Sequence, residues 1–207
     1  MQIANADTFT FGSKNTMFLT GQTGSGKSIL QDKLIDNLVS SNTPKTLQFV
    51  LLDMTGHDFQ DLRENHNEFI RKYIAFISEE GLDVIEEMVI LSGQRIDSSI
   101  NEPQIFICIE ECDIACLDQK RFDNAVIKIN QNAKKANMKL IYSTSSPRTD
   151  VISKQLMSSF DLIVAGQLMN KSDYAYLGVP IIKDTEQYSF TVVDDNHNHH
   201  PSPPPSV

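Results

Sequence analysis

Long apolar runs are missing from this chain of 207 residues. No stretch approaches the roughly 20 apolar residues that a helix needs to cross a bilayer, and the first residues lack the basic-then-apolar pattern of a signal peptide. We therefore expect a chain with no membrane segment and a cytoplasmic location. The length and the hydrophobic content of 40% suit one well-buried soluble domain.

Cysteine and positive charge are also scarce. The three cysteines, Cys108, Cys112 and Cys116, have no histidine or fourth cysteine nearby, so reduced, partly buried thiols are favoured over a metal cluster. The formal net charge of −9 argues against a protein that coats nucleic acid nonspecifically. A third of the basic residues nevertheless fall between Lys120 and Lys139. That segment is either a local basic surface or a solvated helix face.

What the sequence does contain is a glycine-rich loop. Gly21–Ser28 reads Gly-Gln-Thr-Gly-Ser-Gly-Lys-Ser and fills every fixed position of the G-x-x-x-x-G-K-S phosphate-binding pattern. The apolar run Thr16–Thr20 precedes it, and apolar residues at helical spacing follow from Ser28 to Val39. Glycines let the backbone wrap around phosphate oxygens, and the start of the helix offers free N–H groups.

This context predicts nucleoside triphosphate binding, with Lys27 on the β- and γ-phosphates and Ser28 on Mg²⁺. The residues predicted to contact the nucleotide are Gly21, Gln22, Thr23, Gly24, Ser25, Gly26, Lys27, Ser28 and Ile29.

A second motif is an apolar strand that ends in two carboxylates. Ile105–Ile109 is followed directly by Glu110 and Glu111, a Walker B pattern. We predict that Glu110 reaches the Mg²⁺ shell through a water and that Glu111 polarises the attacking water. A carboxylate beside the γ-phosphate favours hydrolysis over simple binding, so the residues predict an ATPase that uses ATP and Mg²⁺.

Apolar runs and helical patterns alternate along the chain, which predicts an α/β fold with a mostly parallel sheet and a nucleotide at the carboxyl ends of its strands. We expect one domain over residues 1–193 and a disordered tail over 194–207, rich in proline and histidine. The expected helices cover 28–39, 59–72, 81–95 and 119–136. The expected strands are Thr16–Thr20, Leu47–Asp53, Tyr73–Ile77, Ile105–Ile109, Leu140–Thr144, Asp161–Ala165 and an edge strand at Tyr188–Val193.

Residues 14–178 resemble the FtsK/SpoIIIE/HerA group of motor ATPases in the order and content of several segments. Gly21–Ser28 is similar to the family loop, and Leu51–Phe59 is similar to its second strand and the acidic residue that follows. Ala133–Pro147, followed by Asp150–Ile152, resembles the family's Arg-Ala to Asp-Val-Ile region. The resemblance implies a RecA-like P-loop NTPase, a three-layer sandwich that forms a hexameric ring and moves double-stranded DNA by ATP hydrolysis.

Some positions depart from the family pattern. Glu110 stands where the family usually has aspartate, and Ser145 stands where a glutamine senses the γ-phosphate, so the resemblance implies that a catalytic hydroxyl does this at Ser145. A later family arginine has no counterpart. Arg148 is the nearest candidate for an arginine finger, and Arg121 and Arg95 are weaker ones.

Three hypotheses follow. The leading one is a small ATP-driven motor that translocates, transfers or packages double-stranded DNA. The second is a same-fold ATPase subunit of a protein secretion or conjugation machine, which the acidic net charge fits better. The third is a nucleotide-binding module with decayed hydrolysis. We also expect homo-oligomeric ring assembly that depends on concentration or DNA, with a protein recruiter as a further partner.

Overall fold

The computed structural model describes residues 2–5, 9–76, 79–111, 118–147, 152–181 and 188–194. Within this part of the chain, no helix combines the length and the apolar character needed to cross a membrane. The strands are β1 (Gln2–Asn5), β2 (Thr16–Thr20), β3 (Leu47–Asp53), β4 (Ile70–Ala75), β5 (Gln104–Glu110), β6 (Met138–Thr144), β7 (Leu162–Ala165) and β8 (Ser189–Asp194). The helices are α1 (Lys27–Ser41), α2 (Gln60–Asn65), the 3-10 turn η1 (Asn67–Phe69), α3 (Glu79–Asp97), α4 (Gln119–Asn132), α5 (Lys154–Met157) and α6 (Lys171–Leu177).

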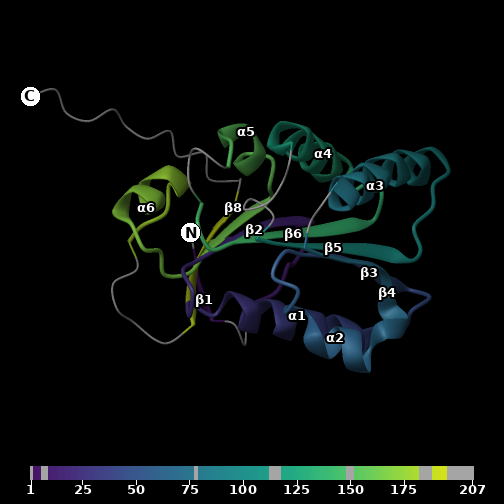
Figure 1. The fold of residues 1–207 in the computed structure, drawn as a ribbon, viewed down its shortest axis with the longest axis horizontal. Coiled ribbons are helices and arrows are strands. Elements are labelled where there is room, and N and C mark those ends of the chain that lie inside the picture. The colour runs from purple at the N-terminus through teal and green to yellow at the C-terminus, as the bar shows by residue number, and fades with distance from the viewer. Residues whose placement is uncertain are drawn as a thin grey trace, which may run out of the picture.

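One eight-stranded sheet organises these elements, in the order β1-β8-β7-β2-β6-β5-β3-β4. The strands from β7 to β4 in this order pair in parallel, whereas β8 pairs antiparallel with both β7 and β1. Helices α3, α4 and α5 lie on one face of the sheet, and α1 and α2 lie on the other (Figure 1). The arrangement confirms the predicted α/β fold with a mostly parallel sheet between two helical layers.

The central strands are apolar along their whole length because both faces of the sheet are covered. In β3, Val50 and Leu52 pack in the core that includes α3 and α4, while Phe49 and Leu51 pack in the core that includes α1 and α2. All four side chains are fully buried. Buried parallel strands of this kind read as continuous apolar runs, which leaves polar chemistry to the residues at their carboxyl ends.

The edge strand β4 begins earlier than predicted. Helical structure in the 59–72 segment is limited to α2 and the 3-10 turn η1, and the chain is extended from Ile70. There it pairs with β3, beginning opposite Phe49. Pairing with a neighbouring strand, which no local pattern reveals, outweighs the polar, helix-like composition of this segment. Ile77, the predicted strand end, lies outside the described residues.

Two other elements also differ from the prediction. Helix α4 ends at Asn132 rather than Ala136, because the chain turns through Asn137 at φ 50° and the Met138 N–H bonds back to the Ala133 carbonyl. Strand β8 is an interior strand and not the predicted edge, because the unpredicted β1 pairs along its other side. It also includes Asp194, one residue beyond the predicted domain boundary. The rest of the predicted tail lies outside the described residues.

Candidate nucleotide-binding site

The glycine loop joins β2 to α1 at the carboxyl end of the sheet. Strand β2 is hydrogen-bonded to β6 on one side and to β7 on the other. Gly24 and Gly26 have φ values of 84° and 95°, which side-chain-bearing residues rarely adopt. A Cβ atom on Gly26 would also lie 2.5 Å from Cδ1 of Tyr188. Glycine is therefore needed at position 26 both for its backbone angle and for its contact with the residue that precedes β8.

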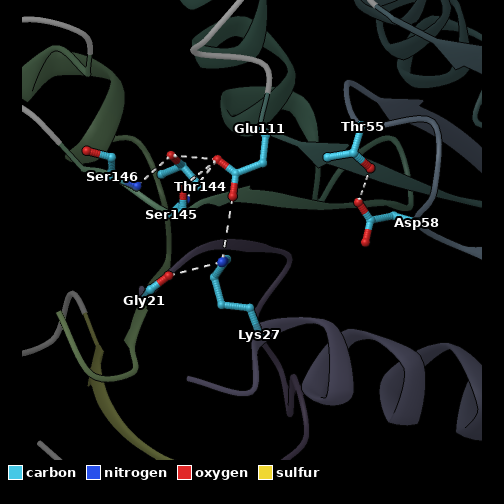
Figure 2. A network of polar contacts seen from close by, with 8 residues as sticks. All are labelled: Gly21, Lys27, Thr55, Asp58, Glu111, Thr144, Ser145 and Ser146. Carbon is cyan, nitrogen blue, oxygen red and sulfur yellow. Dashed lines mark hydrogen bonds and ion pairs between the residues drawn. The ribbon is translucent and has the colours of Figure 1, made fainter. Parts of the chain in front are cut away.

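The Lys27 side chain folds back over the glycine loop. Its ammonium donates a hydrogen bond to the Gly21 carbonyl at 3.0 Å and lies 3.6 Å from Oε1 of Glu111 (Figure 2). Only 8% of Lys27 is exposed, so the carboxylate compensates a positive charge that is largely removed from water. A phosphate group entering the loop would compete with Glu111 for the same ammonium.

Glu111 is the first residue after β5, and its backbone turns out of the sheet at φ 53°. Its N–H donates to the Ser143 carbonyl on β6 at 2.9 Å. Its side-chain Oε2 accepts hydrogen bonds from the Ser145 N–H at 2.9 Å and from the Ser145 hydroxyl at 3.0 Å. One carboxylate therefore contacts both the lysine of the glycine loop and the chain just after β6.

Glu110 is the last residue of β5 and lies in register with Asp53 on β3 and with Ser143 on β6. It is only 3% exposed, and burial raises its pKa to about 8. Burial is the largest cause of this net shift; the charges of Asp58 and Glu111 also raise the pKa, whereas the neighbouring Ser143 side chain and the charge of Lys27 lower it. A cation bound beside Glu110 would favour its ionised form.

These residues meet at a cleft of about 360 Å³. Glu110 and Glu111 both line it, whereas Gly21 and Ser25 are buried within the loop. Ser145 does not line the cleft, and its hydroxyl is hydrogen-bonded to Glu111. The structure thus brings the two predicted motifs together around one cavity. Its lining consists of Gln22, Thr23, Gly24, Gly26, Lys27, Ser28, Ile29, Thr55, Asp58, Glu110, Glu111 and Tyr188.

Three of these lining residues, Thr55, Asp58 and Tyr188, were not predicted as site residues. Thr55 and Asp58 belong to the loop after β3, which the buried Asp53 carboxylate organises by accepting hydrogen bonds from the N–H groups of Thr55, Gly56 and Asp58. The Thr55 hydroxyl lies 2.6 Å from Oδ2 of Asp58 (Figure 2). An aspartate followed by threonine, glycine and aspartate is a local turn signal, but Tyr188 has no local signal because only the sheet brings it to the loop.

The side chains in the cleft fit a magnesium nucleotide. The loop N–H groups and Lys27 are donors of the kind that phosphate needs. Ser28 is exposed at the start of α1, and the carboxylates of Glu110 and Asp58 share the cleft with it. Mg²⁺ prefers such oxygen ligands and completes its shell with water and phosphate. Among the described residues, no group of three or more His, Cys, Asp or Glu side chains is placed to hold a metal ion by itself.

The three candidate finger arginines differ in availability. Arg95 is only 4% exposed and donates to the carbonyls of Ala136 at 2.7 Å and Pro103 at 2.8 Å. It is therefore held inside the molecule, and its guanidinium does not reach the surface. Arg121 on α4 is exposed and paired with Glu86 on α3. Arg148 lies outside the described residues.

The basic segment between residues 120 and 139 is divided. Lys139 donates a hydrogen bond to the Lys14 carbonyl, and its ammonium lies 4.8 Å from the centre of the Phe11 ring. Its charge is therefore engaged in contacts within the molecule. Arg121 is exposed but paired. The segment is therefore neither one continuous basic surface nor wholly a solvated face. The exposed lysines in it are Lys120, Lys128, Lys134 and Lys135.

Cys108 is a buried free cysteine in the middle of β5. Burial raises the pKa of its thiol, which makes it unreactive. Cys112 and Cys116 lie outside the described residues.

Known proteins match both the sequence and the fold. A sequence model of the FtsK/SpoIIIE family matches residues 3–66, the part that holds the glycine loop, α1 and β3. The DNA translocase FtsK of Streptococcus agalactiae is 22% identical over 226 residues, which cover 93% of this chain and 27% of the relative. The chain thus spans about a quarter of the length of the curated relatives it matches.

Two solved structures illustrate the likeness in fold. The cytoplasmic domain of the type VII secretion ATPase EccC of Thermomonospora curvata has a TM-score of 0.72 at 14% identity, over 90% of this chain and 23% of that one. The pCW3 conjugation coupling protein TcpA, in its monomer form with ATPγS, has a TM-score of 0.65 at 13% identity, over 84% of this chain and 56% of that one. The chain is thus similar in sequence to the FtsK/SpoIIIE family over residues 3–66, and its fold is that of these ATPase structures.

Proposed function

We propose that this chain hydrolyses ATP to move double-stranded DNA, as the motor of a translocation, transfer or packaging system. The observation that carries the proposal is the meeting of Lys27 and Glu111 across one cleft, with 3.6 Å between Nζ and Oε1. The curated relatives named as DNA translocases support DNA as the substrate. Since the chain spans only part of their length, their activity on DNA is extended to it as a proposal.

The glycine loop and Lys27 would bind the triphosphate. The backbone N–H groups at the start of α1 and the helix dipole favour negative charge at this point. Lys27 would exchange the Glu111 carboxylate for oxygens of the β- and γ-phosphates. Ser28 and Glu110 would hold Mg²⁺, which neutralises phosphate charge when it is bound.

Glu111 would then act as the base. Once phosphate takes the Lys27 ammonium, Oε1 of Glu111 faces the cleft and can accept a proton from a water that attacks the γ-phosphorus. The new oxygen–phosphorus bond forms as the bond to the bridging oxygen breaks, which yields ADP and phosphate. Oε2, which accepts the hydrogen bonds from Ser145 in this structure, would keep them during this step.

A second subunit would complete the site. Transition-state charge in this reaction is commonly neutralised by an arginine, worth roughly 10³-fold or more in turnover. Arg95 is buried and does not reach the surface. We also propose that the chain assembles into a hexameric ring, at rising concentration or on DNA, and that a protein recruits this ring.

The second candidate function is movement of a protein by the same cleft. The formal net charge of −9 favours it, because binding to the DNA backbone draws on clustered lysine and arginine. The exposed lysines of the basic segment favour DNA, and the two candidates differ in whether DNA stimulates turnover.

The test is steady-state ATP hydrolysis with and without linear duplex DNA. The variants are Lys27→Ala and Glu111→Gln, and the matched control is Lys45→Ala, an exposed lysine in the turn before β3. Turnover that DNA stimulates, that both site variants abolish and that the control retains is the expected result. Turnover lost in both variants but indifferent to DNA would favour a protein substrate. Nucleotide binding with no turnover would instead support a module with decayed hydrolysis.

A further inference from the structure

The end of β6 lies directly beside Glu111. Strands β5 and β6 are parallel, with Glu110 opposite Ser143, so the next residues of the two chains leave the sheet together. The Glu111 N–H donates to the Ser143 carbonyl at 2.9 Å, which extends the strand pairing by one hydrogen bond. Thr144 and Ser145 are therefore within reach of the Glu111 side chain.

The two oxygens of the Glu111 carboxylate have different partners. Oε2 receives both donors of Ser145, the N–H at 2.9 Å and the hydroxyl at 3.0 Å, and lies 3.5 Å from the Thr144 hydroxyl. Oε1 points the other way, toward Lys27 at 3.6 Å. Figure 2 shows Glu111 between these two sets of contacts. Because each Ser145 donor carries a hydrogen bond to an ionised acceptor, both bonds belong to the stronger class.

These contacts direct the Ser145 hydroxyl to Glu111 rather than into the cleft. The cleft is lined by Glu111 but not by Ser145. A residue that senses the γ-phosphate directly must present its polar atom to the phosphate, whereas here that atom is bonded to the carboxylate that would activate the water.

We propose that Ser145 is a positioning residue for Glu111: it holds Oε2 at the end of β6 and so directs Oε1 into the cleft. This inference rests on the proposed ATPase function. An unrestrained glutamate has several rotamers, and misplacing a catalytic group by about 1 Å can lower turnover by roughly 100-fold. The Ser145 N–H remains in any variant, so removal of the hydroxyl alone loosens Glu111 without releasing it.

The kinetic test uses Ser145→Ala, Ser145→Thr and the neighbouring control Ser146→Ala. Ser146 contacts this network through its backbone N–H, which donates to the Thr144 hydroxyl, so loss of its side chain should leave turnover unchanged. Ser145→Ala should lower kcat by about tenfold, the loss expected for one hydrogen bond to a charged group, with little change in KM. Ser145→Thr keeps a hydroxyl and should restore most of the rate.

Affinity for nucleotide separates positioning from sensing. The affinities of ADP and of a non-hydrolysable ATP analogue are measured for the wild type and for Ser145→Ala. Positioning predicts that the ratio of the two affinities is the same in both proteins. A ratio that falls several-fold in Ser145→Ala would overturn the inference in favour of direct contact with the γ-phosphate.

Unfolding of the nucleotide-free protein gives a readout that does not depend on hydrolysis. A double-mutant cycle with Ser145→Ala and Glu111→Ala should show non-additive effects, with a coupling of about three- to tenfold in the unfolding constant. Additive effects would show that Ser145 does not position Glu111, even if the enzyme is active. Non-additive effects in a protein that does not hydrolyse ATP would refute the proposed function while supporting this contact.

Discussion

Replacing Glu110 by glutamine is expected to stabilise the nucleotide-free protein near neutral pH. Glu110 is 3% exposed, and its burial raises its pKa to about 8 from the ordinary value of 4.5. Glutamine has nearly the same shape and no charge to bury. The substitution should therefore remove a desolvation cost, although we expect it to abolish turnover, as happens when stability and activity compete at a site.

The size of the effect follows from the difference between the two pKa values. The folded state binds the Glu110 proton more tightly than the unfolded state does. The contribution of Glu110 to the free energy of unfolding is therefore largest below pH 4.5 and falls as the pH rises toward 8. At about 1.4 kcal/mol per pH unit, the accumulated loss is about 1 kcal/mol at pH 5 and about 3 kcal/mol at pH 7. Glu110→Gln has no such group to titrate. The difference in free energy of unfolding between this variant and the wild type should therefore grow by roughly 2 kcal/mol between pH 5 and pH 7.

The assay is urea unfolding followed by circular dichroism at pH 5, 6, 7 and 8, without nucleotide or divalent metal. Glu102→Gln is the control, because Glu102 is exposed in the loop before β5 and its variant should follow the wild-type profile. Comparing each variant with the wild type at each pH cancels the titration of all other groups. A constant difference between Glu110→Gln and the wild type across this range would refute the reasoning.

Two further pairs of substitutions test packing and burial in the protein. Gly26→Ala would place a Cβ 2.5 Å from Tyr188 at φ 95°, so it should destabilise the protein by about 1–3 kcal/mol and abolish nucleotide binding; Gly93→Ala, in the open interior of α3, should instead stabilise it by about 0.5–1 kcal/mol. Arg95→Ala leaves the carbonyls of Ala136 and Pro103 without their donor and should cost about 2–3 kcal/mol in thermal or urea unfolding, whereas Arg121→Ala breaks an exposed pair and should leave unfolding nearly unchanged. Equal losses for the two arginine variants would contradict the burial argument.

The parts of this protein that could be predicted from sequence are those that local patterns determine. The glycine loop, with β2 before it and α1 after it, lies within about 25 consecutive residues, so its spacing and apolar runs are sufficient. Strands β3 and β5 were predicted to within one residue because burial on both faces makes them continuously apolar.

Features that depend on distant pairing were missed or misplaced. Strand β1 is visible only as the partner of β8, which makes β8 interior. Tyr188 meets Gly26 because β8 lies beside β7 and β7 beside β2. The bond between Ser145 and Glu111 joins residues 34 positions apart. Sequence placed both residues near the nucleotide, but only the geometry shows that one holds the other.

The sheet order also bears on the sequence of events in folding. The strands that flank β2 are β6 and β7, both from the later part of the chain, and β2 does not pair with β3. Asp161 also accepts hydrogen bonds from the N–H groups of Asn15 and Thr16, across about 145 positions. Pairings between residues this far apart form slowly, and β2 cannot complete its pairing until β6 and β7 have formed. A chain that stops after α4 keeps the whole glycine loop but lacks both strands beside β2, so acquisition of nucleotide binding should mark the completion of the sheet.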